Sequence, residues 1–335
     1  MRIHQVAVGA ALVAASLAVP VAGPPMDAGA DTAPLLAVAP NVGHGPDGPE
    51  LDHSPVGPQW EVDLHAPWAA SEWDEAEFTA DQPDSTALPT VHAVYLHPLD
   101  QPSRFQEFAA MLQADARDAS KKLADLYGRG IRWDERTGAG GASYVDITVV
   151  RSAMTTAELA APQWQFNAVY SELFRVGLNK PNKKYAVWLD APSTFCGQAM
   201  LSQDRRRRAS NGNELTSLAI VYRKGAPVDV DGGFCRGRTL LHELGHAMGA
   251  LQEGAPNAFD GAHCADSAED VMCYAPPALN DTGRQEFDYR NDDYWDPAAN
   301  PALGSSTKLP WWTVNLSRFI CPTTGCANAN KNPGY

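Results

Sequence analysis

Hydrophobic residues between positions 90 and 250 follow two alternating patterns. Short apolar runs predict strands at Val91–Leu96, Tyr144–Val150, Tyr185–Leu189 and Leu218–Tyr222. Apolar residues at helical spacing predict helices from Ser103 to Gly128 and near Trp164–Gly177. Ser103 and Gln106 match a capping box at the start of the first helix, and Gly128 stands where a C-cap glycine is expected. Because strands alternate with helices, we expect an α/β (α+β) fold with a mixed, mostly parallel sheet and helices packed on it.

The two ends of the chain lack this regular pattern. In residues 1–30, Arg2 precedes an apolar run and then small residues, which predicts a secretory signal peptide. No later segment is apolar over about twenty residues, so we expect no stable membrane insertion once this peptide is removed. Residues 31–89 are rich in Pro, Gly, Ala and Asp, which indicates a disordered linker or propeptide. The folded domain should then cover 90–327, with an α/β upper lobe at 90–250 and an irregular lower lobe at 251–327.

Six cysteines follow the predicted signal peptide: Cys196, Cys235, Cys264, Cys273, Cys321 and Cys326. An even number in an exported chain favours three disulfides and a secreted, extracellular location. Proximity in the sequence favours pairs 264–273 and 321–326, which leaves 196 to pair with 235. A thiolate zinc site is the alternative, and the sequence lacks the Cys-x-x-Cys pair that would support it.

The charge of the chain limits its partners. Its 335 residues include 26 Lys and Arg against 40 Asp and Glu, a formal net charge of −14. Nucleic acids and anionic membrane surfaces require a cationic face, so we expect neither as a partner. Because 44% of the residues are hydrophobic, the composition also excludes a wholly disordered chain. We expect the mature protein to be a monomer.

The most informative motif lies in residues 239–249, where His242, Glu243 and His246 form a His-Glu-x-x-His pattern. On a helix, positions i and i+4 share one face, so both imidazoles can bind one metal ion. Glu243 lies about 100° round the helix from His242, so its carboxylate points beside that ion and can hold a bound water. The leucines around the motif predict a buried helix, in which these polar groups are costly unless they are satisfied.

Zinc is the metal that best suits this pattern. It accepts imidazole ligands and lowers the pKa of a bound water to about 7 in a three-ligand site. Glu243 would take a proton as the water attacks a polarised carbonyl, and would then pass it to the leaving amine. The motif therefore predicts a Zn²⁺ cofactor bound by His242 and His246, with Glu243 as the catalytic residue.

With Gly249 and the segment Asp270-Val271-Met272-Cys273-Tyr274, the sequence resembles the metzincin clan of zinc endopeptidases. The pattern of this clan is His-Glu-x-x-His-x-x-Gly-x-x-His followed by a Met-turn. The resemblance implies a metzincin-like catalytic domain with a cleft between the two lobes. It also implies that Met272 is the structural Met-turn methionine beneath the metal. Tyr274, two residues later, would support the metal or the oxyanion.

The chain departs from this pattern at the third histidine, where it has Gln252. A glutamine amide oxygen is a poor, neutral zinc ligand. We expect His263 to be the third ligand, because a Cys264–Cys273 bridge would tie it to the Met-turn. Gln252 itself, Glu253 and an aspartate such as Asp260 are the alternatives.

A different clan of zinc peptidases takes its third ligand from a glutamate on a later helix, a role open to Glu269. The segment Ala255–Cys264 has no helical period, and this arrangement would leave Met272 without a role. We therefore prefer the metzincin-like arrangement.

These features predict a secreted zinc-dependent endopeptidase that acts on a protein or peptide substrate. One alternative is a secreted binding or structural module with a non-catalytic zinc site, which a closed fourth coordination position would mark. Another is a cell-wall peptide amidase with the same chemistry in a different cleft. Hard oxygen ligands lie close together at Asp288, Asn291, Asp292, Asp293 and Asp296, so this segment is either a surface loop capped by aspartate side chains or a site for a calcium ion as a further cofactor.

Overall fold

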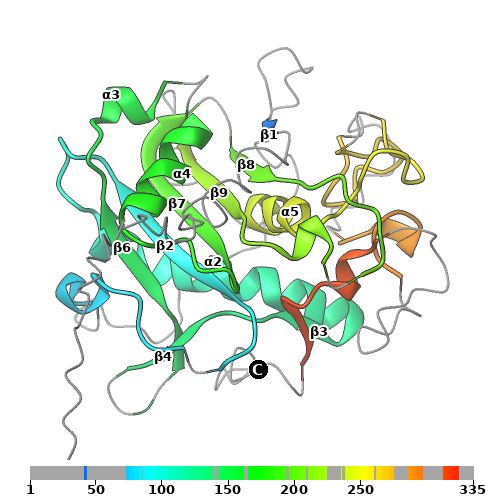
Figure 1. Cartoon of the computed structure of the whole chain (residues 1–335), viewed down its shortest axis with the longest axis horizontal. Helices are drawn as coiled ribbons and strands as arrows, with labels where there is room; N and C mark the ends of the chain where they lie inside the picture. The colour runs from blue at the N-terminus through cyan, green and yellow to red at the C-terminus, as the bar shows by residue number, and fades with distance from the viewer. Residues whose placement is uncertain are drawn as a thin grey trace, which may run out of the picture. The chain divides into compact units, whose positions relative to one another are not determined.

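A six-stranded sheet forms the framework of the part of the chain that the computed structural model describes (Figure 1). The described residues are 41–43, 73–84, 86–138, 141, 143–161, 165–193, 196–208, 210–224, 235, 238–259, 262–274, 286–296 and 312–323. The order across the sheet is β1 (Asn41–Gly43), β8 (Gly197–Met200), β9 (Leu218–Lys224), β7 (Lys183–Ser193), β2 (Thr90–His97) and β6 (Ile147–Arg151). β6, β2, β7 and β9 run parallel to one another, whereas β8 is antiparallel to β9 and β1 is antiparallel to β8. This is the mixed, mostly parallel sheet that the alternating pattern predicts.

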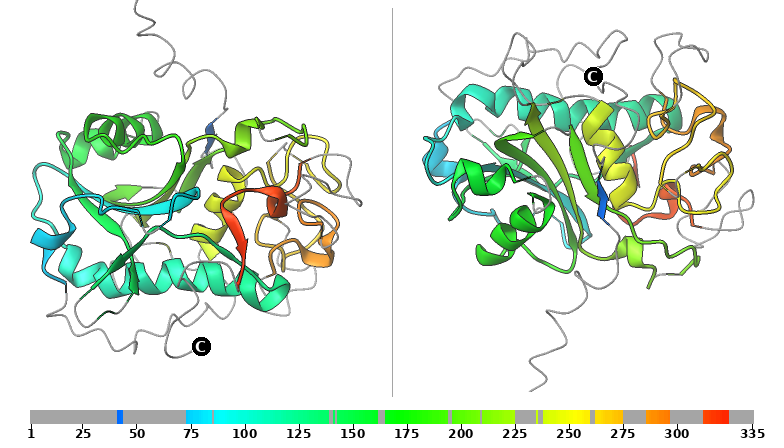
Figure 2. Two further views of the ribbon diagram at one scale, coloured as in Figure 1. Left: turned by 60° about the horizontal axis from the view of Figure 1, so that its bottom comes forward. Right: turned by 90° about the horizontal axis from the view of Figure 1, so that it is seen from above.

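The central strands are buried along almost their whole length because both faces of the sheet are covered. All eight residues of β2 are buried, and Tyr95 lies in register with Val149 of β6 and Trp188 of β7. Helices α2 (Phe105–Tyr127) and α5 (Arg238–Ala247) cover one face and contact each other, whereas α3 (Thr156–Leu159) and α4 (Gln165–Arg175) lie on the opposite face (Figure 2). The strand predicted at 144–150 is divided into β5 (Ser143–Val145) and β6.

Two small sheets and short 3₁₀ turns complete the described elements. β3 (Arg129–Ile131) pairs with β10 (Ile320–Pro322), and β4 (Glu135–Thr137) pairs with β5. The 3₁₀ turns are η2 (Glu75–Phe78), η4 (Gly212–Glu214), η5 (Tyr289–Asn291) and η7 (Val314–Leu316). The region after α5 is therefore rich in loops, as expected, and it lies beside one end of the sheet (Figure 1).

The ends of α2 agree only partly with the prediction. Gly128 ends the helix in the left-handed conformation, with φ of 63° and its N–H donating to the carbonyl of Ala124. The helix begins at Phe105, and its N-cap Arg104 makes no side-chain capping bond. The guanidinium of Arg104 instead pairs with Glu107 at 2.8 Å, and Ser103 accepts only the N–H of Phe105. The predicted capping box at Ser103 is wrong because this ion pair organises the first turn.

Part of segment 31–89 is among the described residues. Trp73 and Phe78 are 2% and 3% exposed and pack on the core, where the ring of Trp73 contacts Tyr144 and the ring of Phe78 contacts Phe105. The chain before β2 thus contributes apolar side chains to the core. The predicted signal peptide, residues 1–30, lies outside the described residues. None of the helices among the described residues has the length and apolar character needed to span a membrane.

Two disulfides are present among the described residues. Cys196 is bonded to Cys235, which links β8 to the segment before α5, and Cys264 is bonded to Cys273 in the loop region that follows α5. Both pairs agree with the prediction, in which proximity favoured Cys264–Cys273 and Cys196–Cys235 was the pair that remained. Cys326, the predicted partner of Cys321, lies outside the described residues. The disulfides fit an oxidising compartment.

Candidate metal centre

Helix α5 carries the His-Glu-x-x-His motif in a buried position. Leu240, Leu241 and Leu244 pack into the core, so the opposite face of the helix presents His242 and His246 together. The two histidines are 5% and 0% exposed. A four-residue spacing on a helix would by itself leave them near each other, and burial holds them there.

Gly249 ends this helix in a conformation that only glycine adopts easily. Its φ is 92°, and its N–H donates to the carbonyl of His246 at 2.8 Å. A Cβ at this position would lie 2.6 Å from the side chain of Asn213 and 2.8 Å from Trp312, so there is no space for one. Trp312 in turn donates its indole N–H to the carbonyl of Met248 at 3.0 Å. The chain can therefore reverse tightly after His246 and return toward it.

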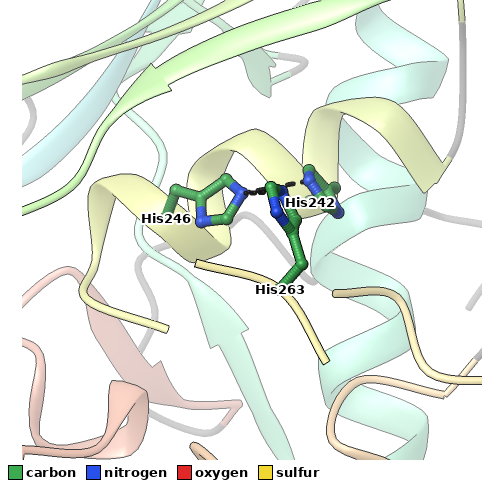
Figure 3. A group of neighbouring side chains, drawn as sticks. All are labelled: His242, His246 and His263. Carbon is green, nitrogen blue, oxygen red and sulfur yellow. Dashed lines mark hydrogen bonds between the residues drawn. The ribbon is translucent and has the colours of Figure 1, made fainter. Parts of the chain in front are cut away.

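His263 lies on this returning loop and completes a cluster of three imidazoles (Figure 3). The Nε2 atom of His246 is 3.0 Å from Nε2 of His242 and 3.2 Å from Nε2 of His263. His263 is 3% exposed, so all three rings are buried. The structure thus brings together the three histidines that the sequence singled out.

The geometry of these nitrogens fits a zinc ion. Tetrahedral zinc with Zn–N bonds of about 2.0–2.1 Å requires ligand nitrogens about 3.3 Å apart, close to the observed separations. Nδ1 of His242 lies 2.7 Å from the carbonyl oxygen of Val271, which places its proton on Nδ1 and leaves a lone pair on Nε2. A carbonyl partner on the remote nitrogen is the usual support for a metal-binding histidine. Several lone pairs that converge in a buried site are repulsive until a cation lies between them.

The segment Asp270–Tyr274, which the sequence predicted to form a Met-turn, packs against α5. A Cβ added to Gly245 would lie 2.8 Å from Sδ of Met272 and 3.2 Å from the ring of Phe287. Met272 is fully buried, and its N–H donates to Oδ1 of Asp270 at 2.7 Å. The absence of a side chain at Gly245 therefore lets the methionine approach the helix that carries His242 and His246.

Arg238, at the start of α5, holds this segment by its backbone. Its guanidinium donates to the carbonyls of Asp270 and Cys273 at 2.7 Å each and to that of Val271 at 3.2 Å. The carbonyl of Val271 also accepts the proton of His242. Sequence reasoning missed Arg238, although its spacing of four residues from His242 places both on one helix face. No sequence signal could have identified the carbonyl of Val271 as a partner of His242, because every residue has a backbone carbonyl.

Tyr274 packs against two of the three histidines. Its ring stacks on that of His263, with ring centres 4.0 Å apart and planes 27° apart, and its hydroxyl lies 3.4 Å from Nε2 of His242. The N–H of Tyr274 donates to the carbonyl of Cys264 at 2.8 Å, across the Cys264–Cys273 disulfide. The disulfide and this hydrogen bond keep Tyr274 and His263 on adjacent strands of the loop.

Glu243 points toward the sheet beside the three histidines. It is 1% exposed, and a Cβ on Gly197 would lie 2.3 Å from Oε1 of Glu243, so its carboxylate lies against the backbone of β8. Burial, and then the charge of Glu243, raise the pKa of the Tyr222 hydroxyl well above its ordinary value. The sequence showed no sign that Gly197 leaves the space for this carboxylate, because the two residues come from distant parts of the chain.

The other candidate third ligands do not join the histidines. Neither Glu253 nor Glu269 shares the ligand group formed by the three imidazoles within the described part of the chain. Gln252 is 1% exposed, and its amide N–H donates to the carbonyl of Gly249 at 3.3 Å. Asp260 lies outside the described residues. The geometry thus favours His263 as the third ligand, in place of the histidine that the metzincin pattern has where this chain has Gln252.

A second group of possible ligands lies at the sheet, formed by Asp81, His92, Asp134 and Asp146. Nδ1 of His92 is 2.9 Å from Asp134, and Nε2 is 2.8 Å from the hydroxyl of Thr148, so both ring nitrogens are satisfied. The ammonium of Lys183 lies 2.6 Å from Asp134 and 2.8 Å from Asp81. It supplies the positive charge that a metal ion would otherwise provide. This group is an ion-pair network that stabilises the fold.

Comparisons with known proteins give distant matches only. No family model matches the chain, and no curated protein matches it. Among solved structures, it is similar to metalloproteinase-II from Bacteroides fragilis, with a TM-score of 0.33 and 16% identity over 64% of this chain and 54% of that protein. It is also similar to OgpA from Akkermansia muciniphila. For the wild-type protein the TM-score is 0.33 with 12% identity over 64% of this chain and 61% of that one. For the catalytically inactive form in complex with an O-glycopeptide substrate, the TM-score is 0.31 with 12% identity over 60% and 57%.

The chain therefore spans little more than half the length of the first of these proteins, 54%. Likenesses of this size establish no family and no shared activity.

Proposed function

We propose that this protein is a secreted zinc-dependent endopeptidase with a metzincin-like catalytic domain. The observation that carries the proposal is the convergence of the Nε2 atoms of His242, His246 and His263, at 3.0–3.2 Å from His246, in a buried site beside Glu243. Secretion is supported by the predicted signal peptide and by the two disulfides. The net charge of −14 gives no support to a nucleic-acid partner.

The three histidines would hold the zinc ion through Nε2. A zinc ion in such a site supplies a Lewis acid that polarises a carbonyl and makes a bound water acidic near pH 7, about the value for other three-ligand sites. The contact between His242 and the carbonyl of Val271 keeps that imidazole in the tautomer that can bind. Met272, packed against Gly245, keeps the loop under α5 at a constant distance from both helical ligands.

Glu243 would move the proton. As the carbonyl carbon of the peptide is attacked by water, the carboxylate of Glu243 accepts a proton from that water. It then donates this proton to the nitrogen of the leaving amine, and the peptide C–N bond breaks. Burial against Gly197 keeps the carboxylate in one orientation and out of bulk water, which favours transfer to and from the reacting atoms.

Tyr274 would stabilise the negative oxygen that develops on the attacked carbonyl. Its hydroxyl lies 3.4 Å from Nε2 of His242, so it is close to the reacting centre and is able to donate a hydrogen bond there. Removal of one such donor usually costs about 2.7–4 kcal/mol of transition-state stabilisation. We therefore expect Tyr274→Phe to lower kcat by about a hundredfold or more, with zinc content unchanged.

The central test separates zinc binding from catalysis. Glu243→Gln should retain about one zinc per chain, by metal analysis of the purified protein, and should lose hydrolysis of a denatured protein substrate. His263→Ala should lose zinc, whereas the matched variant Gln252→Ala should retain it. Full hydrolysis by Glu243→Gln would refute the catalytic role of this residue. Equal zinc retention by His263→Ala and the parent would exclude His263 as the third ligand.

The same test addresses the structural alternative. A zinc ion that only stabilises the fold would leave the parent protein without hydrolytic activity at full zinc occupancy. Glu243→Gln would then raise or leave unchanged the melting temperature without any activity to lose. The placement of a buried acid next to three converging imidazoles favours the catalytic function, because a structural site gains nothing from that acid.

A further inference from the structure

Aspartates gather in the loop region on the far side of the Met-turn, and two of them organise the loop. Asp288 accepts the N–H groups of Asp292 and Asp293 at 3.1 Å each and that of Tyr294 at 2.8 Å. Asp270 accepts the hydroxyl of Tyr294 and the N–H of Tyr289, both at 2.6 Å. These hydrogen bonds satisfy both carboxylates and fold the loop around them.

Three other aspartates lie close together, and two of them have a buried oxygen without a hydrogen-bond partner. Carboxylate oxygens of Asp266, Asp292 and Asp293 all lie within 4.8 Å of one another. Asp293 is 1% exposed. Its Oδ1 accepts an N–H of Asn257 at 3.1 Å, but its buried Oδ2 has no hydrogen-bond partner. Oδ1 of Asp292 is also buried without a partner. Carboxylate oxygens removed from water in this way are costly unless a cation or a donor reaches them.

The described residues offer no cation to this group. No lysine or arginine in the described part of the chain forms an ion pair with any of these three aspartates. Arg290 attracts Asp266 only at longer range, and its guanidinium lies over the ring of Tyr289 at 4.9 Å.

We propose that Asp266, Asp292 and Asp293 bind a calcium ion. All three ligands are oxygens, which disfavours zinc. Calcium binds carboxylate oxygens at about 2.3–2.6 Å in a flexible geometry, whereas magnesium requires a near-ideal octahedron and usually keeps several of its waters. Three carboxylates from two separate loops, with their oxygens within 4.8 Å of one another, therefore suit calcium better. Asp266 and Asp292 are partly exposed, so water can fill the remaining coordination positions.

This set differs from the one that sequence proximity suggested. Asp288 is used by backbone N–H groups, and Asp296 is absent from the ligand groups among the described residues. Asp266 replaces them, although it is more than twenty residues away in the sequence. It follows His263 by three positions and stands between Cys264 and Cys273, so the ion would link the loop that carries His263 to the loop at 286–296.

Terbium(III) is a suitable probe because it takes the same oxygen ligands as calcium, and Tyr294 and Trp295 next to the site can sensitise its emission. The full-length protein is stripped of metal, reloaded with zinc and titrated with terbium. We expect saturable emission that calcium displaces. Asp293→Asn and Asp266→Asn should each weaken terbium binding at least tenfold. Asp125→Asn, on the exposed face of α2, is the matched control and should bind as the parent does.

A melting experiment gives an independent measure. Calcium should raise the melting temperature of the parent and of Asp125→Asn, and should leave that of Asp293→Asn unchanged. Without calcium, Asp293→Asn should melt no lower than the parent, because a neutral amide of the same shape replaces a carboxylate whose ionised form is costly to bury. If this variant fails to fold, the partly exposed Asp266→Asn carries the test.

Two outcomes would overturn the proposal. One is a parent protein whose emission and melting do not respond to calcium, and the other is terbium binding that neither substitution weakens. Zinc content is measured on the same samples. Loss of calcium binding with zinc retained would leave the peptidase proposal intact, so the two proposals can fail separately.

Discussion

The contact between Gly197 and Glu243 gives the sharpest test of how the candidate active site is built. The backbone at Gly197 is open to any L-amino acid, so Gly197→Ala introduces a methyl group without backbone strain. That carbon would lie 2.3 Å from Oε1, 2.6 Å from Cγ and 2.7 Å from Cδ of Glu243. Normal carbon contacts begin near 3.5 Å, so the carboxylate must move by about 1 Å.

Two magnitudes follow from this displacement. Crowding in a closely packed site costs about 1–3 kcal/mol of the free energy of unfolding. A misplacement of about 1 Å in a catalytic group can lower the rate by about a hundredfold. We therefore expect Gly197→Ala to retain its zinc, to unfold at lower urea concentration and to lose most of its kcat/KM on a peptide substrate.

A double-mutant cycle isolates the contact itself. In a Glu243→Ala background the space for the new methyl group is open, so Gly197→Ala should cost less than about 0.5 kcal/mol. In that background it should even be neutral or stabilising, because alanine loses less backbone entropy than glycine in a strand. An equal cost in both backgrounds would show that the carboxylate does not lie against β8, and unchanged kcat/KM in the single variant would show that its position is unimportant for catalysis.

Three further predictions concern the surroundings of the site. Arg238→Met leaves the carbonyls of Asp270, Val271 and Cys273 without their donor. We expect the free energy of unfolding in urea to fall by about 1–3 kcal/mol and zinc to be lost faster to a chelator. Unchanged zinc retention would contradict this. Burial raises the pKa of Glu135 from 4.5 to about 7, so the stability that its protonated form contributes is complete below about pH 4.5 and is lost as the pH rises through about 7. Glu135→Gln should therefore flatten the dependence of the melting temperature between about pH 5 and about pH 8, and a uniform shift at every pH would argue against it. β1 pairs with the outer edge of β8, and an exposed strand edge can bind an extended peptide by backbone hydrogen bonds. We therefore expect removal of residues 1–43 to raise the turnover of an extended peptide severalfold. An equal rate would show that the substrate does not bind at this edge.

The α/β framework could be predicted because its signals are local. Each central strand is a short apolar run, and α2 and α5 repeat their apolar residues with the helical period. Strand β8 was missed, since four residues with a glycine at the start carry little periodic signal. The capping box at Ser103 was predicted from two residue types alone, and the competing ion pair between Arg104 and Glu107 could be seen only in three dimensions.

The candidate metal ligands divide in the same way. His242 and His246 follow from helix geometry, because a spacing of four residues determines which side chains share a face. His263 required an additional inference, that the Cys264–Cys273 disulfide would bring its loop back to the helix. The calcium ligands that we propose lie partly in the region that the sequence indicated, but proximity in the sequence included Asp288 and omitted Asp266.

The sequence by itself determined which residues have the chemistry for zinc binding and proton transfer, since residue type and helical spacing are properties of a short stretch of chain. Only the tertiary structure decided which partners complete that chemistry: the carbonyl of Val271 behind His242, the space at Gly197 for Glu243, and the guanidinium of Arg238 across the Met-turn. These contacts join segments that are far apart along the chain. Their positions depend on the packing of the whole core, which no local pattern encodes.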